Sequence, residues 1–255
     1  MGFLPKNKRA FILAMIALCI IVISFAYFHY KNINESKDPR VKSARLLYEK
    51  YNEYAVINDF NNIFSLLDSV EYIYSQYPHY KESFEVGVLY NNRAAAYLTM
   101  TLHNIPDDNF ANLTKDSLLN LSEFNVKKSI SIYENWLEGT ANLEGKELKN
   151  YIKKDFLDGL NNFSEKDKEK FLDHRVNELE TAKYETERRL SVSYTNLGII
   201  YRHRENYEQA ILCYQKALKL WEQNLSAENN LNILLGKPLK KRNLIQKLFP
   251  PKREK

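Results

Sequence analysis

The chain has 255 residues and a formal net charge of +5. Only seven Gly and seven Pro interrupt it, and Leu, Ala, Glu and Lys are frequent, which favours helices over many short strands and predicts an all-α protein. Two cysteines exclude a disulfide-rich scaffold, because Cys19 lies in an apolar N-terminal run and Cys213 is alone in the remainder.

The N-terminal segment is the most apolar part of the chain. Residues 10–28 carry no charge, and a helix of this length measures about 28 Å, close to the hydrocarbon thickness of a bilayer. We therefore predict a transmembrane helix over 10–30, preceded by a short segment 1–9. A cleavable signal peptide is the alternative, since Ser24-Phe25-Ala26 fits a cleavage site, but the apolar run continues to Phe28.

The positive charges around this segment predict its orientation. Lys6, Lys8 and Arg9 abut the predicted span, whereas the cations after it are spread along the chain. The positive-inside rule then keeps the N-terminus in the cytoplasm and places the remainder outside it, which is the periplasm of the cell envelope if the protein is bacterial.

The remaining chain divides into a linker (31–40), a helical domain (41–235) and a basic tail (236–255). Asp38 and Pro39 are typical of a helix cap and a first helical position. Loops are predicted at 58–59, 102–116 and 138–145, from breaker and turn residues. Ser164 begins a long helix that runs to about Arg204.

More than half of residues 165–190 are charged, which predicts a long helix with a heavily solvated face. The alternative is a coiled coil with a partner or a second copy. Its apolar positions, Leu172, Val176, Leu179 and Leu190, are interrupted and give it little support.

Residues 191–224 carry a spaced set of aromatic and small residues. The set is Tyr194, Leu197, Gly198 and Tyr201 on one helix, and Ala210, Tyr214 and Ala217 on the next. This pattern resembles the 34-residue tetratricopeptide repeat (TPR), in which small residues let two helices approach closely and aromatic residues fill the space around them. The proline usual near the end of the repeat is replaced by Glu222.

Weaker echoes of the repeat cover 44–77 and 87–137, the second interrupted by the insertion at 102–116. The segment 225–235 continues as an amphipathic helix suited to cover the last apolar face. The resemblance implies a right-handed superhelical array of helical hairpins behind the transmembrane helix.

Catalytic and metal-binding patterns are sparse. No phosphate loop, HExxH, Cys-x-x-Cys or Gly-x-Ser-x-Gly motif occurs. His174 and Glu178 share one helical face, but a surface pair accounts for them better than a metal site because no third ligand is evident. Asp107-Asp108 beside Pro106 is typical of a turn. We therefore predict no catalytic residues, no metal and no cofactor.

The resemblance implies a peptide-binding groove lined by the first helix of each repeat. Its predicted residues are Asn91, Ala95, Leu98, Thr195, Ile199, Arg202 and His203. Arg202, His203 and Arg204 favour an acidic peptide, or else form a solvated turn. The carboxylate clamp of chaperone-binding relatives is not supported. Asn52 and Asn92 occupy its asparagine positions, but Tyr48, Val192 and Asn196 stand where its cations belong.

The sequence thus predicts a membrane-anchored scaffold that binds an unidentified protein or peptide. An oligomerising structural protein and an unrecognised helical enzyme are the alternatives. The tail holds eight Lys or Arg and one Glu, so it is either a solubilising segment or a contact for anionic lipid, nucleic acid or an acidic partner. Specific nucleic-acid recognition is not predicted, because aromatic residues are almost absent from the tail.

Overall fold

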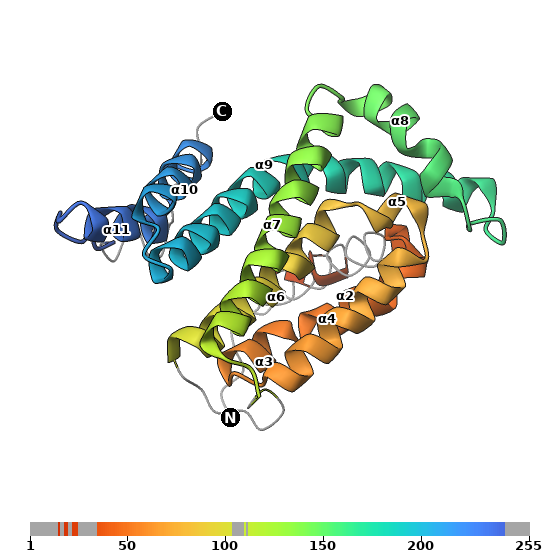
Figure 1. Ribbon diagram of the computed structural model, residues 1–255. Coiled ribbons are helices and arrows are strands. Elements are labelled where there is room, and N and C mark those ends of the chain that lie inside the picture. The colour runs from red at the N-terminus through yellow and green to blue at the C-terminus, as the bar shows by residue number, and fades with distance from the viewer. Residues whose placement is uncertain are drawn as a thin grey trace, which may run out of the picture.

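The computed structural model describes residues 15, 18, 19, 22–24, 35–103, 110 and 112–242. All regular structure in these residues is helical (Figure 1). In chain order the elements are η1(Pro39–Val41), α2(Lys42–Glu49), α3(Tyr51–Val56), α4(Phe60–Ser75), α5(Pro78–Lys81), α6(Phe84–His103), α7(Lys115–Thr140), α8(Gly145–Leu157), α9(Glu165–His203), α10(Tyr207–Leu220) and α11(Leu225–Leu234).

Side-chain caps define where several helices begin. Asp38 accepts a hydrogen bond from the Arg40 backbone amide with Pro39 at the first position, and Ser164 accepts one from the Asp167 amide, as predicted. Asn58 has a φ of +55°, which turns the chain before α4. The predicted interruption at 58–59 is therefore confirmed.

Three helical hairpins make up most of the fold. The first pairs α2 and α3 with α4, the second pairs α6 with α7, and the third pairs the C-terminal part of α9 with α10. The helix α11 packs on α10 and α9. The insertion predicted at 102–116 separates α6 from α7, and its residues 104–109 and 111 lie outside the described residues.

The second and third hairpins each contain the same kind of close contact between their two helices. A Cβ built on Gly198 would lie 2.5 Å from Cε1 of Tyr214, and one built on Gly87 would lie 2.5 Å from Cε1 of Tyr133. Both tyrosines are fully buried. Each ring therefore lies flat against a glycine that has no side chain to displace it, so the two hairpins use the same crossing.

The helix α6 divides the core into two clusters. Ala94 and Leu98 pack with α7, α8, α9 and α10, whereas Leu89 and Met100 pack with α2, α4 and α5. This two-sided burial explains why α6 is apolar around most of its circumference. The first and third hairpins thus pack against different residues of α6.

The N-terminal part of α9 packs against α8, and α8 also contacts α5. All four apolar positions considered for a coiled coil, Leu172, Val176, Leu179 and Leu190, are buried within the chain. They are therefore not available to a partner helix. The solvated-face prediction needs one correction, because Arg175 on this charged segment is only 1% exposed.

Arg175 is the centre of a buried ion cluster. Its guanidinium donates to Glu85 Oε1 at 2.6 Å, to Glu178 Oε2 at 3.2 Å and to His79 Nε2 at 2.8 Å, and it lies 4.6 Å from the ring centre of Tyr80. Such a charge is tolerated in the interior only when most of its donors have acceptors. The cluster joins α5, α6 and α9.

The pair His174 and Glu178, noted in the sequence, belongs to the edge of this cluster. His174 Nε2 lies 3.3 Å from Glu178 Oε1, and Glu178 also pairs with Arg45 at 2.9 Å. Ser36 Oγ lies 3.1 Å from His174 Nδ1. Glu178 therefore links α9 to α2, and among the described residues no cluster of His, Cys, Asp or Glu is suited to a metal ion.

Burial lowers the pKa of His79 to about 3 from its ordinary 6.5, and the charge of Arg175 acts in the same direction. The unfolded chain therefore binds a proton below pH 6.5 that the folded chain does not bind. We expect the free energy of unfolding to fall as pH drops from 6.5 toward 3, by at most about 1.4 kcal/mol per pH unit from this group. Urea titrations at pH 7.0, 6.0 and 5.0 test this, and an equally steep decline in His79→Gln would assign it to other groups.

No helix among the described residues has the length and apolarity needed to cross a membrane. The span predicted at 10–30 falls outside the described residues except at 15, 18, 19 and 22–24. Residues 243–255 of the predicted basic tail also lie outside them.

Candidate peptide-binding groove

The first helices of the three hairpins, α2, α6 and α9, line a hollow of about 330 Å³. Its walls include Tyr48 of α2, Asn91 and Asn92 of α6, and Arg189 and Val192 of α9. The size lies at the lower end of ligand pockets in proteins. Of the seven residues predicted for the groove, Asn91 lines this hollow and the other six do not.

Arg189 is the cation of this hollow. Its guanidinium carbon lies 5.6 Å from the ring centre of Phe84, and among the described residues it forms no ion pair. The side chain is half-buried. Burial raises the pKa of the nearby Tyr48, while the positive charge of Arg189 acts in the opposite direction. A partly desolvated guanidinium without a carboxylate is suited to bind one from a ligand.

Two asparagines of α6 are held in place beside it. Asn92 Nδ2 donates to Tyr48 Oη at 2.7 Å. Asn91 Oδ1 accepts from Ser193 Oγ at 2.9 Å and from Asn196 Nδ2 at 3.1 Å, which leaves its own Nδ2 without a partner among the described residues. The amide orientations follow from these networks. The hollow thus presents one guanidinium, the phenol of Tyr48 and one amide donor on fixed helices, together with the carboxylate of Glu85, which Arg175 already binds.

Comparison with known families decides what the third hairpin is. Residues 191–224 match the family model of the tetratricopeptide repeat.

No curated protein and no solved structure matches the chain. Within the repeat, Tyr194, Leu197, Ala210, Tyr214 and Ala217 are buried, and Tyr201 is half-buried. The residues named from the repeat pattern are therefore the ones that pack α9 against α10.

Not every residue predicted for the TPR groove lies on an open surface. Leu98 is buried in the core. Thr195 is 3% exposed, donates to Ser191 O and accepts from Asn224 Nδ2 at 2.9 Å. Both side chains contribute to packing instead, because neighbouring helices cover the faces on which they lie. Asn91 lines the hollow, whereas the half-buried Ala95 and Ile199 do not.

The cations at the end of the first TPR helix also serve the fold. Arg202 donates to Asn230 Oδ1 of α11 at 2.7 Å, and Arg204 pairs with Glu123 of α7. Burial and the charge of Arg202 lower the pKa of His203. None of the three lines the hollow. Arg202 and Arg204 fasten α9 to its neighbours rather than forming a free basic surface in the groove.

Sequence reasoning missed Arg189, which lies two residues before the TPR begins. Its charge is inconspicuous within the heavily charged segment 165–190. Spacing would have identified it, because Arg189, Val192 and Asn196 are separated by three and four residues and so share one helical face. Val192 and Asn196 had already been aligned with ligand-contacting positions.

Proposed function

We propose that this chain is a membrane-anchored, non-enzymatic scaffold that binds a partner protein through the hollow between α2, α6 and α9. A tetratricopeptide repeat suggests protein–protein interaction, and the arrangement of three first helices around one hollow is the observation that carries the proposal. The hairpins would form a right-handed superhelix behind a transmembrane helix at 10–30, with the N-terminus in the cytoplasm and the helical domain outside it.

The chemistry of the hollow favours a partner segment with a carboxylate. Arg189 would bind that carboxylate, and the free amide of Asn91 would donate a further hydrogen bond to it or to the partner backbone. Tyr48 and Val192 supply apolar contact beside the charge. A charge-assisted contact of this kind contributes about 1.5–3 kcal/mol.

Site-specific photocrosslinking tests the groove. A benzoylphenylalanine at position 192 faces the hollow, and one at Tyr72, which is 68% exposed on α4, serves as the matched surface position. In cells of the native host we expect a discrete adduct from position 192 that position 72 does not give. Arg189→Glu should reduce this adduct at least fivefold, because it removes about 1 kcal/mol or more of binding.

Arg188→Glu is the control for the charge change, since Arg188 lies next in sequence, packs on Trp221 and does not line the hollow. The proposal that the partner binds in this groove would be rejected if positions 192 and 72 gave identical adducts. It would also be rejected if Arg189→Glu and Arg188→Glu reduced the yield of the adduct equally.

Membrane anchoring rests on residues 10–28, which carry no charge. We expect the full chain to stay with the membrane fraction after carbonate extraction at high pH, and a chain starting at Asn32 to be released. We expect activity from a reporter enzyme that is fused after residue 255 and that functions only outside the cytoplasm. Release of the full chain by carbonate would reject the anchor, and a cytoplasmically active reporter would reject the orientation.

A further inference from the structure

A second and larger hollow lies between α4, α5, α7 and α8. Its volume is about 620 Å³, and its floor includes Val86 and Tyr90 of α6. These residues are on a different face of α6 from Asn91 and Asn92, so this cleft is separate from the groove. It includes Tyr151 and Ile152 of α8, a helix that lies between the second and third hairpins and belongs to neither.

The shape of the cleft follows α7. Its lining residues on that helix are Lys128, Ile132, Asn135, Trp136, Gly139 and Thr140. These positions form one helical stripe, and the twelve steps of 1.5 Å from Lys128 to Thr140 make the stripe about 18 Å long. An extended chain advances about 3.3 Å per residue, so roughly five residues would span the cleft.

One end of the cleft presents a cation. Lys128 Nζ donates to Tyr90 Oη at 2.6 Å and lies 4.1 Å from the centre of that ring, but it has no carboxylate partner among the described residues. The neighbouring Glu71 accepts from Tyr90 at 2.5 Å and pairs with Arg93, which also binds the exposed Asp68. Arg93 is thus shared by two carboxylates, and with Lys128 the four side chains carry no net charge, but Lys128 is the cation of this group that contacts no carboxylate directly.

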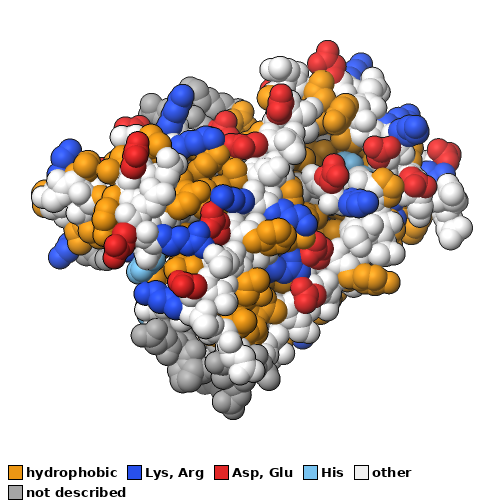
Figure 2. Space-filling model, viewed as in Figure 1, with side chains coloured by type: hydrophobic (Ala, Val, Ile, Leu, Met, Phe, Trp, Pro, Cys, Tyr) orange, Lys and Arg blue, Asp and Glu red, His pale blue; other side chains and the backbone are white. Residues whose placement is uncertain are grey.

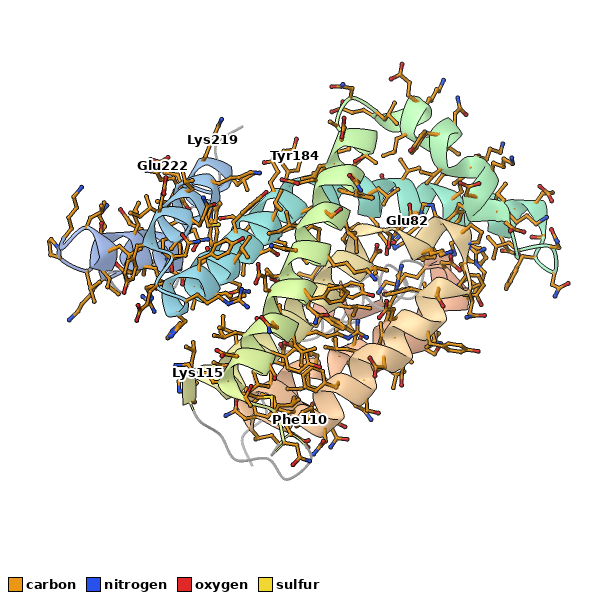
Figure 3. The ribbon with its side chains drawn as sticks, viewed as in Figure 1. Glu82, Phe110, Lys115, Tyr184, Lys219 and Glu222 are labelled. Atoms are coloured by element: carbon orange, nitrogen blue, oxygen red, sulfur yellow. The ribbon has the colours of Figure 1, made fainter. Side chains whose placement is uncertain are left out.

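The opposite end presents an excess of carboxylate. Glu82 and Asp155 are exposed, form no ion pair among the described residues and outnumber the single cation there, Lys81. Glu82 is the residue that follows α5 and lies at the end of that helix (Figure 3). The surrounding face mixes acidic, basic and hydrophobic side chains (Figure 2), so the separation of charge is local to the cleft.

Apolar surface connects the two ends. Ile132, Trp136 and Ile152 line the middle of the cleft. The exposed ring of Tyr151 lies beside α7 at Gly139, where a Cβ built on the glycine would be 3.5 Å from the Tyr151 hydroxyl, an ordinary contact. Aromatic side chains flanked by polar groups are typical of surfaces that bind a partner.

We propose that this cleft binds an extended segment of about five residues of a partner polypeptide, with an acidic side chain at Lys128, an apolar side chain over Trp136 and a basic side chain at Glu82 and Asp155. The occupant is a polypeptide, because the cleft matches an extended backbone in length and offers polar groups along it. The scaffold would then engage chains on two faces, one through the TPR groove and one through the cleft built by α8.

The two tryptophans of the chain make the test direct, since Trp136 lines the cleft and Trp221 does not. The full chain in dodecyl maltoside is labelled with 5-fluorotryptophan, and Trp221→Phe assigns the two ¹⁹F signals. The probes are three pools of blocked pentapeptides with varied apolar and polar centres. Their end residues are Glu and Lys, Glu and Glu, or Lys and Lys.

We expect the Glu–Lys pool to shift the Trp136 signal at a concentration at least fivefold below that of the like-charged pools, with Trp221 unmoved. Lys128→Ala and Asp155→Ala should each remove this preference, and Arg189→Ala should preserve it, since Arg189 lies in the other hollow. Equal shifts from all three pools would overturn the proposed preference for an acidic side chain at one end of the cleft and a basic one at the other. If no pool shifted the ¹⁹F signal of Trp136, the proposal that this cleft binds a polypeptide would be overturned.

Discussion

Replacing Arg175 with Met is expected to lower the free energy of unfolding by about 3–5 kcal/mol. The guanidinium is the partner of Glu85; the Arg175 side chain is 2% exposed and the Glu85 side chain is 17% exposed. Methionine fills a similar volume but leaves the Glu85 carboxylate buried without its cation. The cost is therefore that of an unpaired charge more than that of a lost contact.

Urea unfolding followed by helical circular dichroism measures this loss. Arg188→Met is the matched control, because Arg188 is 52% exposed and should cost less than about 1 kcal/mol. The double variant Arg175→Met/Glu85→Met should regain part of the stability, since both ends of the pair become apolar. A double variant less stable than Arg175→Met would show that the carboxylate is not the source of the loss.

Gly198→Ala and Gly87→Ala are each expected to destabilise the protein by about 1–3 kcal/mol. The new methyl group would lie 2.5 Å from the nearest carbon of Tyr214 or Tyr133, and both rings are fully buried and so have little room to move. The helices must then separate or the rings must leave their packing positions. This steric cost outweighs the gain of roughly 1 kcal/mol that Ala brings to a helix.

Gly139→Ala provides the control for both variants. Its Cβ would meet only the Tyr151 hydroxyl, at 3.5 Å, so the helical preference of Ala should dominate and the protein should become slightly more stable. Thermal unfolding of the three variants should therefore give two decreases and one increase in Tm. A destabilised Gly139→Ala together with a neutral Gly198→Ala would contradict the close crossing.

The third hairpin was predictable because both of its helices carry their spacing within 34 residues. The second hairpin uses the same glycine–tyrosine contact, but Gly87 and Tyr133 are 46 positions apart, whereas Gly198 and Tyr214 are 16 apart. An insertion between α6 and α7 accounts for the difference, so only the geometry makes the equivalence plain. Local signals such as Asp38 and Ser164 were sufficient to predict where helices begin.

Charged residues were harder to interpret from sequence. Arg175 and Arg189 lie in the same charged stretch as many solvated side chains. One is buried by α5 and α6, which are far away in the sequence, and the other lines a hollow made by three separate helices. Burial of this kind depends on tertiary packing, which residue type and helical period do not report. The predicted positions Leu98 and Thr195 were assigned to the groove for the same reason.

The length of α9 has a consequence for how the protein unfolds. Arrays of repeats contact only their neighbours, and they can therefore lose structure one unit at a time from an end. Here one continuous helix of 39 residues reaches from the ion pairs with Arg45 and Glu85 to the terminal hairpin with α10. Unfolding of α9 as a whole therefore breaks contacts with the first two hairpins and with α10 together. We expect the described helices to melt in a single cooperative transition, with amide exchange in α4 and α10 governed by the same global opening.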